Sequence, residues 1–559
     1  MSFSLLTGLV AATLLVLAFC GTAAQAGTIW DGGGADTNIN TAANWDADAL
    51  PTSLTDGTQT LTFGTGGSTA TINTNVNALG LVINRDAAFA IANGAGNLTI
   101  GTGGITVTLP NTTARTHTIS ESNLILAGDQ TWSVTNNTNT AALTVSSNIT
   151  GSFGITKAGT GTLTLSGANS TFTGGIIVNA GRLDATNTGL GTGNVTIASN
   201  AFIGLTSAGT YTNNITINGG VGNGAIQSFT NSTLGGRITL ASDATIGSRS
   251  ANNTLTLSGG IDTVAGANRT LTLNLLGLGG SSNNATTTIS SNAVNLGTGG
   301  TLDIGTGITV GTGTMNLNVG GNTWGTTIAR TAASAGASAN LTLNLGAANA
   351  LGSSSSVLQL GLTNTANETI TVNLNGNNQT IGGLRSFGST GSASANGTRT
   401  ITSATAATLT IDNSSATNYL YDGVISGNVS LTKSGSATQT LSGNNTYTGA
   451  TTVNGGTLST NAADRISDSS AITVASGATF SLGGSETVGS IAGAGNYSIA
   501  GFTLTAGGDD RSTEVSGNIT GANGALTKSG AGTLVLSGNN TSPGATTINN
   551  GTLEIASTG

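Results

Sequence analysis

Charged side chains are scarce in this chain. Asp, Glu, Lys and Arg make up 6% of its 559 residues, and the formal net charge is −8. Ordinary globular domains carry about 25% charged residues, and disordered chains usually have a high net charge, so the composition fits neither class. Because there is no basic stripe and no lysine-rich cluster, we expect neither nucleic acid nor an anionic lipid surface among its partners.

Cysteine, histidine and proline are also rare, with one, one and three residues respectively. Cys20 lies in the N-terminal apolar segment, so a chain cleaved after Ala26 would have no cysteine to form a disulfide. His117 alone is too little for a histidine-based zinc site. Asp46 and Asp48 would bind calcium only weakly, since the Asp/Gly nonapeptide of calcium-binding β-rolls is missing. We therefore expect no metal and no other cofactor.

The residues that favour helices are nearly absent as well. Only five Glu and three Lys occur, whereas Thr, Val and Ile are abundant and Gly numbers 88. The branched side chains of Thr, Val and Ile suit a pleated surface. The composition therefore predicts an all-β fold, and 559 residues are too many for one compact core, which favours stacked repeats or several domains.

Residues 1–26 are predicted to be a signal peptide that forms a signal helix. Residues 5–19 are apolar, and Ala24 and Ala26 follow in the spacing of a signal cleavage site. One alternative is a membrane anchor, although a spanning helix needs about 20 apolar residues. A second alternative is lipidation at Cys20, as in bacterial lipoprotein signals. Phe19 stands where such signals have a small residue.

One motif occurs three times, at residues 155–183, 431–458 and 526–553. Each copy begins with an aliphatic residue, Thr and Lys, continues through Gly to a Leu-Ser-Gly run, and ends in Gly-x-Leu. Chance would not place every lysine of the chain at the same motif position, so we treat the shared positions as structural. They are Lys157, Lys433 and Lys528, Gly159, Gly435 and Gly530, and Leu165, Leu441 and Leu536.

In the first and third copies, Leu alternates with Thr or Val, which is the period of a strand with one buried face. Gly, Ser and Asn follow every short strand and provide turns. Strands this short can wind into coils that pair with the coil above and below, with Gly at the corners and Asn stacked along the rod. We predict an elongated β-solenoid over residues 61–559, with the repeats near 149–185, 423–460 and 514–555, and a cap segment over residues 27–60.

Two positions in the motif required an interpretation. We interpret the three lysines as cations at strand edges that discourage pairing with other chains, the alternative being a ligand-binding row. Gln439 stands where the other copies have Leu163 and Leu534. Either one inward position is polar in that copy or its strand is shifted.

The motif resembles the passenger-associated transport repeat of autotransporters. Lys433, Gly435, Leu441, Tyr447 and Gly456 are among the residues that carry the match. The resemblance implies a right-handed parallel β-helix that is exported to the cell surface, associated with the outer membrane, or released from it. It also implies that the repeats assist transport and folding rather than catalysis. We expect the outer-membrane translocator not to lie in this chain.

The sequence leaves three functions open. The first is a structural or adhesive surface protein without a catalytic site, whose partners would be polysaccharide, matrix or other cell-surface components. The second is a β-helical polysaccharide lyase or hydrolase, with acids brought together from separate coils; Asp509 and Asp510 are the only adjacent acids, and we interpret them as a solvated turn and His117 as a surface residue. The third is an inert spacer of a larger autotransporter.

Overall fold

The computed structural model describes residues 29–48, 50–51, 54–64, 66–109, 115–135, 141–219, 224–275, 284–305, 308, 311–331, 338–361, 368–386, 397–542 and 544–556. Ala24, Ala26 and Cys20 lie outside the described residues, and so does the expected signal helix. Two single-turn 3₁₀ helices, η1 (Ala42–Asn44) and η2 (Asp46–Asp48), interrupt an otherwise β structure. No helix among the described residues is long and apolar enough to cross a membrane.

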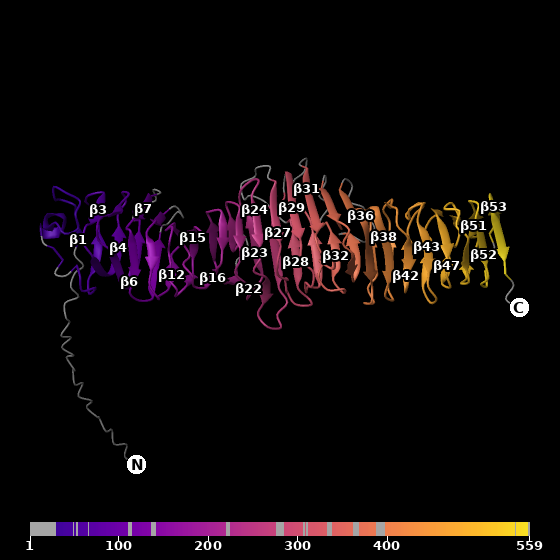
Figure 1. The fold of residues 1–559 in the computed structure, drawn as a ribbon, viewed down its shortest axis with the longest axis horizontal. Coiled ribbons are helices and arrows are strands. Elements are labelled where there is room, and N and C mark those ends of the chain that lie inside the picture. Colours follow the sequence, from indigo (N-terminus) through magenta and orange to yellow (C-terminus); the bar gives the residue numbers. More distant parts are fainter. Residues whose placement is uncertain are drawn as a thin grey trace, which may run out of the picture.

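The described strands stack into a long rod, with β1 at one end and β53 at the other (Figure 1). The strands of the described residues pair in parallel, apart from one isolated antiparallel bridge between Trp30 and Trp45. Neighbours in a sheet come from successive coils of the chain. The prediction of an elongated, all-β parallel solenoid is therefore confirmed.

The strands of the described residues form six sheets. Sheet 1 contains β1 (Ile29–Trp30), β2 (Thr60–Phe63), β4 (Val76–Asn84), β6 (Leu98–Thr108), β8 (Asn123–Leu126), β9 (Gln130–Thr135), β11 (Asn148–Thr150), β12 (Ile155–Ala158), β14 (Ile176–Val178), β16 (Val195–Ser199), β19 (Ile215–Gly219), β22 (Ile238–Leu240) and β25 (Ile261–Thr263). Sheet 2 contains β3 (Thr69–Ile72), β5 (Ala90–Asn93), β7 (Arg115–Ile119), β10 (Ala141–Val145), β13 (Thr162–Leu165), β15 (Gly181–Ala185), β17 (Ala201–Leu205), β20 (Ile226–Ser228), β23 (Ala244–Ser248), β26 (Thr270–Asn274), β28 (Thr301–Ile304), β30 (Thr326–Ala329), β32 (Val357–Leu360) and β35 (Gly383–Ser386).

Sheet 3 contains β18 (Gly209–Tyr211), β21 (Ser232–Leu234), β24 (Thr254–Leu257), β27 (Ala285–Ile289), β29 (Gly311–Leu317), β31 (Ala339–Leu345), β33 (Glu368–Asn373), β34 (Gln379–Ile381), β36 (Thr398–Asp412), β38 (Val424–Ser434), β40 (Thr446–Tyr447), β41 (Thr451–Val453), β43 (Ala471–Val474) and β46 (Ser490–Ala492). Sheet 4 contains β37 (Tyr419–Tyr421), β39 (Thr438–Leu441), β42 (Thr457–Thr460), β44 (Thr479–Ser481), β47 (Asn496–Ser498) and β50 (Ile519–Thr520). Sheet 5 contains β45 (Glu486–Val488), β48 (Thr503–Ala506), β51 (Ala525–Lys528) and β53 (Thr546–Ile548), and sheet 6 contains β49 (Thr513–Val515), β52 (Thr533–Leu536) and β54 (Thr552–Ile555).

The alternation of Leu with Thr places one face of each strand in a narrow core. In β13, Leu163 and Leu165 are buried while the intervening Thr164 is only partly covered. Leu163 lies in register with Leu143 on one side and Leu183 on the other. Each inward residue thus packs on the same position of the coils above and below, so apolar burial accumulates along the rod rather than around one centre.

Glycine is required at the corners of the repeat. Gly159, Gly435 and Gly530 have φ values of 75°, 74° and 67°, a region in which residues with a Cβ are strained. A Cβ on Gly530 would also come within 1.8 Å of the Gly507 carbonyl oxygen in the preceding coil. These corners therefore need glycine for the turn and for the close approach of successive coils.

Aromatic side chains fill the core where the first described coils begin. Trp30 packs edge-on against Trp45 with ring centroids 5.3 Å apart, and Phe63 lies 6.3 Å from each. Phe89 continues the stack 4.9 Å from Phe63. Residues 27–60 thus contribute large apolar side chains to this end of the core, and their role as a cap stays a prediction.

Gln439 compensates for a gap in the backbone ladder. Sheet 2 ends at β35, and the next coil begins sheet 4 with β37. From β39, the Gln439 side-chain amide donates to the Leu384 carbonyl at 2.9 Å and accepts from the Leu384 N–H at 3.3 Å. The buried glutamine therefore pairs with β35 as a strand residue would. Of the two readings of this position, the inward polar one is correct, since Gln439 is fully buried in β39.

We predict that Gln439→Leu destabilises the rod, although it restores the residue found in the other two repeats. The change leaves a buried N–H and carbonyl unpaired, at an expected net cost of about 1–3 kcal/mol. Hydrogen exchange should accelerate in the β35 segment. Thr440→Leu, on the outward face of the same strand, is the control and should leave that exchange unchanged. If β35 exchanges as slowly in Gln439→Leu as in the wild type, Gln439 does not stabilise β35 through Leu384.

Candidate functional site

Each repeat lysine forms a clamp that holds two coils together from inside. Lys157 Nζ donates to the carbonyls of Ala158 at 2.9 Å, Gly159 at 2.7 Å and, in the next coil, Ala180 at 2.9 Å. Lys433 makes the same three contacts with Ser434, Gly435 and Gly455, at 2.6, 2.9 and 3.1 Å. Lys528 repeats the pattern with Ser529, Gly530 at 2.8 Å and Asn550 at 3.4 Å.

The clamp depends on the adjoining glycine. The positive φ of Gly159, Gly435 and Gly530 belongs to the turn whose carbonyl accepts from the lysine of the same copy. Three carbonyl oxygens around one nitrogen match the three donors of an ammonium group. The Lys-x-Gly spacing of the repeat therefore encodes a donor and the turn that presents its acceptors.

The interpretation of these lysines as strand-edge cations is wrong. The exposed fractions of Lys157, Lys433 and Lys528 are 0%, 0% and 1%, so none of them lies at an edge or can contact a ligand in solution. Burial lowers the pKa of Lys157 to about 8. It also lowers the pKa of Lys433 to about 8, with Asp412 opposing the change. Both groups therefore remain mostly protonated at pH 7 and keep three donors each.

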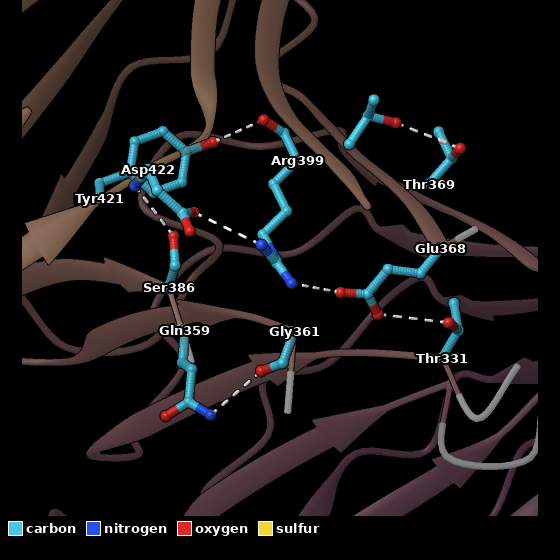
Figure 2. A network of polar contacts seen from close by, with 10 residues as sticks. Thr331, Gln359, Gly361, Glu368, Thr369, Ser386, Arg399, Tyr421 and Asp422 are labelled. Carbon is cyan, nitrogen blue, oxygen red and sulfur yellow. Dashed lines mark hydrogen bonds and ion pairs between the residues drawn. The ribbon is translucent and has the colours of Figure 1, made fainter. Parts of the chain in front are cut away.

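A second polar cluster brings acids together from separate coils, around Arg399 (Figure 2). Arg399 Nη2 lies 2.6 Å from Glu368 Oε1, and Arg399 Nη1 lies 3.4 Å from Asp422 Oδ1. Thr331 Oγ1 donates to the other Glu368 oxygen at 3.3 Å. Tyr421 donates its hydroxyl to the Arg399 carbonyl at 3.1 Å. The cluster thus joins β33, β36 and the turn before β38.

The geometry of this cluster is that of an interior ion pair. Glu368 and Arg399 are in phase with the inward residues Ile370 and Ile401 on their strands, and their side chains are 0% and 3% exposed. Asp422 borders a surface pocket of about 230 Å³. The guanidinium pairs closely with the buried Glu368 and more distantly with the partly exposed Asp422, so the Glu368 charge is compensated in the interior. Because Glu368 does not reach solvent, the cluster lacks an accessible carboxylate pair of the kind a glycosidase needs.

The other sequence-predicted residues are not brought together. His117 is fully buried in β7, and neither ring nitrogen has a hydrogen-bond partner among the described residues. Its assignment to the surface is therefore wrong; burial, with a smaller contribution from Arg85, lowers the pKa of His117 to about 4. Asp509 accepts from Ser490 at 2.7 Å, and Asp510 is exposed in a turn with φ 61°. In the described part of the chain, no three His, Cys, Asp or Glu side chains form a group able to hold a metal ion.

Sequence reasoning missed Glu368, Arg399 and Asp422, although the strand period could have found the first two. Glu368 precedes Ile370 by two residues, and Arg399 precedes Ile401 by two. This phase places both charges on the inward face. Nothing in the sequence pattern marks Asp422, whose position depends on how the neighbouring coils align.

We predict that Lys433→Met loosens the two coils that the lysine joins. Three buried carbonyls lose their donor, at an expected cost of about 2–4 kcal/mol in local opening. Hydrogen exchange should accelerate by about tenfold or more within residues 431–459 and stay unchanged within residues 526–555, because coils in a solenoid contact only their neighbours.

Thr432→Met is the matched control, since Thr432 precedes Lys433 on the same strand and faces outward. It should leave exchange in residues 431–459 as in the wild type. A Lys433→Met chain that is as well protected as the control would show that the clamp does not hold the coils together.

Comparisons with known proteins agree with the repeats. Residues 155–185, 431–459 and 526–555 match the passenger-associated-transport-repeat family, at the three places where the sequence repeats. Comparison with curated proteins and with solved structures gives no significant match. The repeat family implies an exported protein that is secreted or associated with the surface. The chain is thus a parallel β-solenoid that carries three passenger-associated transport repeats, as expected for an autotransporter passenger.

Proposed function

We propose that the chain is a structural and adhesive passenger without catalysis of its own, displayed at the cell surface or released from it. The observation that carries the proposal is the regular polar surface that stacked coils create. On sheet 3, Asn344 donates to Asn316 at 2.9 Å, and Asn316 donates to Thr288 at 3.1 Å. These residues occupy the same register on adjacent strands. Hydroxyls and amides therefore recur at the strand spacing of about 4.8 Å.

The buried polar groups support a mechanical role. The lysine clamps and Gln439 bond to backbone groups, and the terminal nitrogens of Arg399 pair with Glu368 and Asp422. Each of these contacts joins one coil to a nearby coil. A rod built in this way can add coils one at a time as the chain emerges, since each coil needs only its neighbour.

One observation favours the hypothesis of a lyase or hydrolase: Glu368 and Asp422, from separate coils, both lie next to Arg399. The shared guanidinium and the burial of Glu368 weigh against it, because a catalytic carboxyl must reach the substrate. The spacer reading predicts that the outward polar face binds nothing.

The test places the purified chain from residue 27 onward on a panel of neutral and acidic polysaccharides and matrix proteins. Bound protein and newly formed sugar ends are measured in the same wells. We expect retention without product. Formation of product would overturn the non-catalytic proposal, and comparing the Asp422→Asn and Asp510→Asn variants would show which of the two acids the reaction needs. Absence of retention on every surface would overturn the adhesive proposal.

A further inference from the structure

The outer face of sheet 2 carries a cluster of arginines and phenylalanines that the core does not require. Arg182 on β15 and Phe202 on β17 lie directly in register and face outward. In the other two copies of the repeat, the position of Arg182 is occupied by Thr457 and Thr552. Because threonine at this position is compatible with the solenoid fold in the other two copies, the fold alone does not explain Arg182.

The rings and guanidinium groups of this cluster interleave. The Arg182 guanidinium lies 5.7 Å from the centre of the Phe202 ring and 4.7 Å from that of Phe229. Phe229 follows β20, and Arg249 follows β23 on the next coil, with its guanidinium 5.7 Å from the centre of the Phe229 ring. These distances are those of cation–π contacts. The rings therefore fix the positions of the two guanidinium groups, although both arginines lie on the surface of the rod.

Polar partners orient both arginines. Arg182 Nε lies 2.6 Å from Asp184 Oδ1, and Arg249 Nη1 lies 2.8 Å from Gln227 Oε1. Burial raises the pKa of Asp184, with the bond to Arg182 opposing that rise. The contact of Arg182 with Asp184 uses Nε, which leaves its two terminal nitrogens for a second acceptor.

Gly204 makes room for the cluster. A Cβ at this position would lie 2.1 Å from the Asp184 carboxylate and 2.9 Å from the Phe229 ring. The outward side of β17 at Gly204 is therefore occupied by residues from the coils on either side. Any larger residue would displace the ring that separates the two arginines.

Beside the cluster runs a groove of about 610 Å³. Its walls combine the two arginines and Phe202 with hydroxyl and amide side chains, and it is lined by Thr160, Thr162, Arg182, Asn200, Phe202 and Arg249. It crosses strands β13, β15 and β17, which at about 4.8 Å per strand gives a width of about 10 Å. An aromatic wall with a few fixed polar groups is the usual construction of a ligand site.

We propose that this groove binds a carboxylate-bearing saccharide chain, such as one that contains uronic acid. Arginine offers two parallel donors that match a carboxylate, Phe202 offers an apolar face to a sugar ring, and the threonine and asparagine side chains suit sugar hydroxyls. A long polyanion such as a nucleic acid fits less well, since the groove has two arginines in a chain of net charge −8. The inference rests on the proposed adhesive function and names its ligand class and site.

The experiment measures binding of oligogalacturonate to the full chain from residue 27 onward by calorimetry, with the methyl ester of the same oligosaccharide as the uncharged ligand. We expect the ester to bind at least about tenfold more weakly. Arg249→Gln and Phe202→Ala should each weaken binding of the acid by about tenfold. Arg249 is preferred to Arg182 because Arg182→Gln would leave the buried Asp184 without its partner.

Arg511→Gln is the control, since it removes the same charge from an exposed arginine on a distant coil, and it should bind within about twofold of the wild type. Equal binding of Arg249→Gln and the wild type, equal binding of acid and ester, or binding of a sulfated galactan alone would each overturn the site. Retention on other surfaces with an unaffected Arg249→Gln variant would leave the adhesive function standing, whereas no retention on any surface would remove both.

Discussion

The backbone ladder between successive coils is the constraint on which the structure depends. Each coil bonds to the coils above and below through parallel strands only a few residues long. The turns between those strands leave carbonyl and N–H groups that point inward, and buried backbone groups of this kind need hydrogen-bond partners. The fold therefore needs donors and acceptors inside the rod as well as apolar side chains.

The buried polar residues meet that need in several ways. The repeat lysines donate to three carbonyls at each glycine corner, and Gln439 pairs with β35 where the ladder is interrupted. Glu486 accepts from the backbone N–H groups of Arg465 and Ile466 at 2.9 and 3.1 Å, and burial raises the pKa of Glu486 to about 7. A few polar side chains thus supply the hydrogen bonds that the apolar residues of the core cannot make.

Much of the fold followed from the sequence because the strand period and the glycine corners are local signals. The alternation that placed Leu163 and Leu165 inside is visible in β13, and the Leu-Thr-Leu runs outside the three repeats form strands such as β24 and β31. The same alternation also puts Lys157 in phase with Ile155 and Arg399 in phase with Ile401. The interpretation of the lysines as strand-edge cations followed from their fixed motif position near a glycine corner, although their phase indicates the interior.

Other features depend on which coils become neighbours, and no local pattern contains that information. The pairing of Gln439 with Leu384 joins residues 55 positions apart, and the cluster of Arg182, Phe202, Phe229 and Arg249 draws on four strands or their following turns. Coil lengths vary along the chain, so the register that brings these side chains together becomes visible only in the folded rod.

The central claim is that the repeat lysines are interior clamps, and amine labelling tests it most directly because the chain has only three lysines. The folded chain is treated with an amine-reactive ester near pH 7, and modification is followed at each site by mass spectrometry. We predict that Lys157, Lys433 and Lys528 react about a hundredfold or more slowly than in the unfolded chain, since labelling requires local opening. Rapid modification of these lysines in the folded chain would contradict the account.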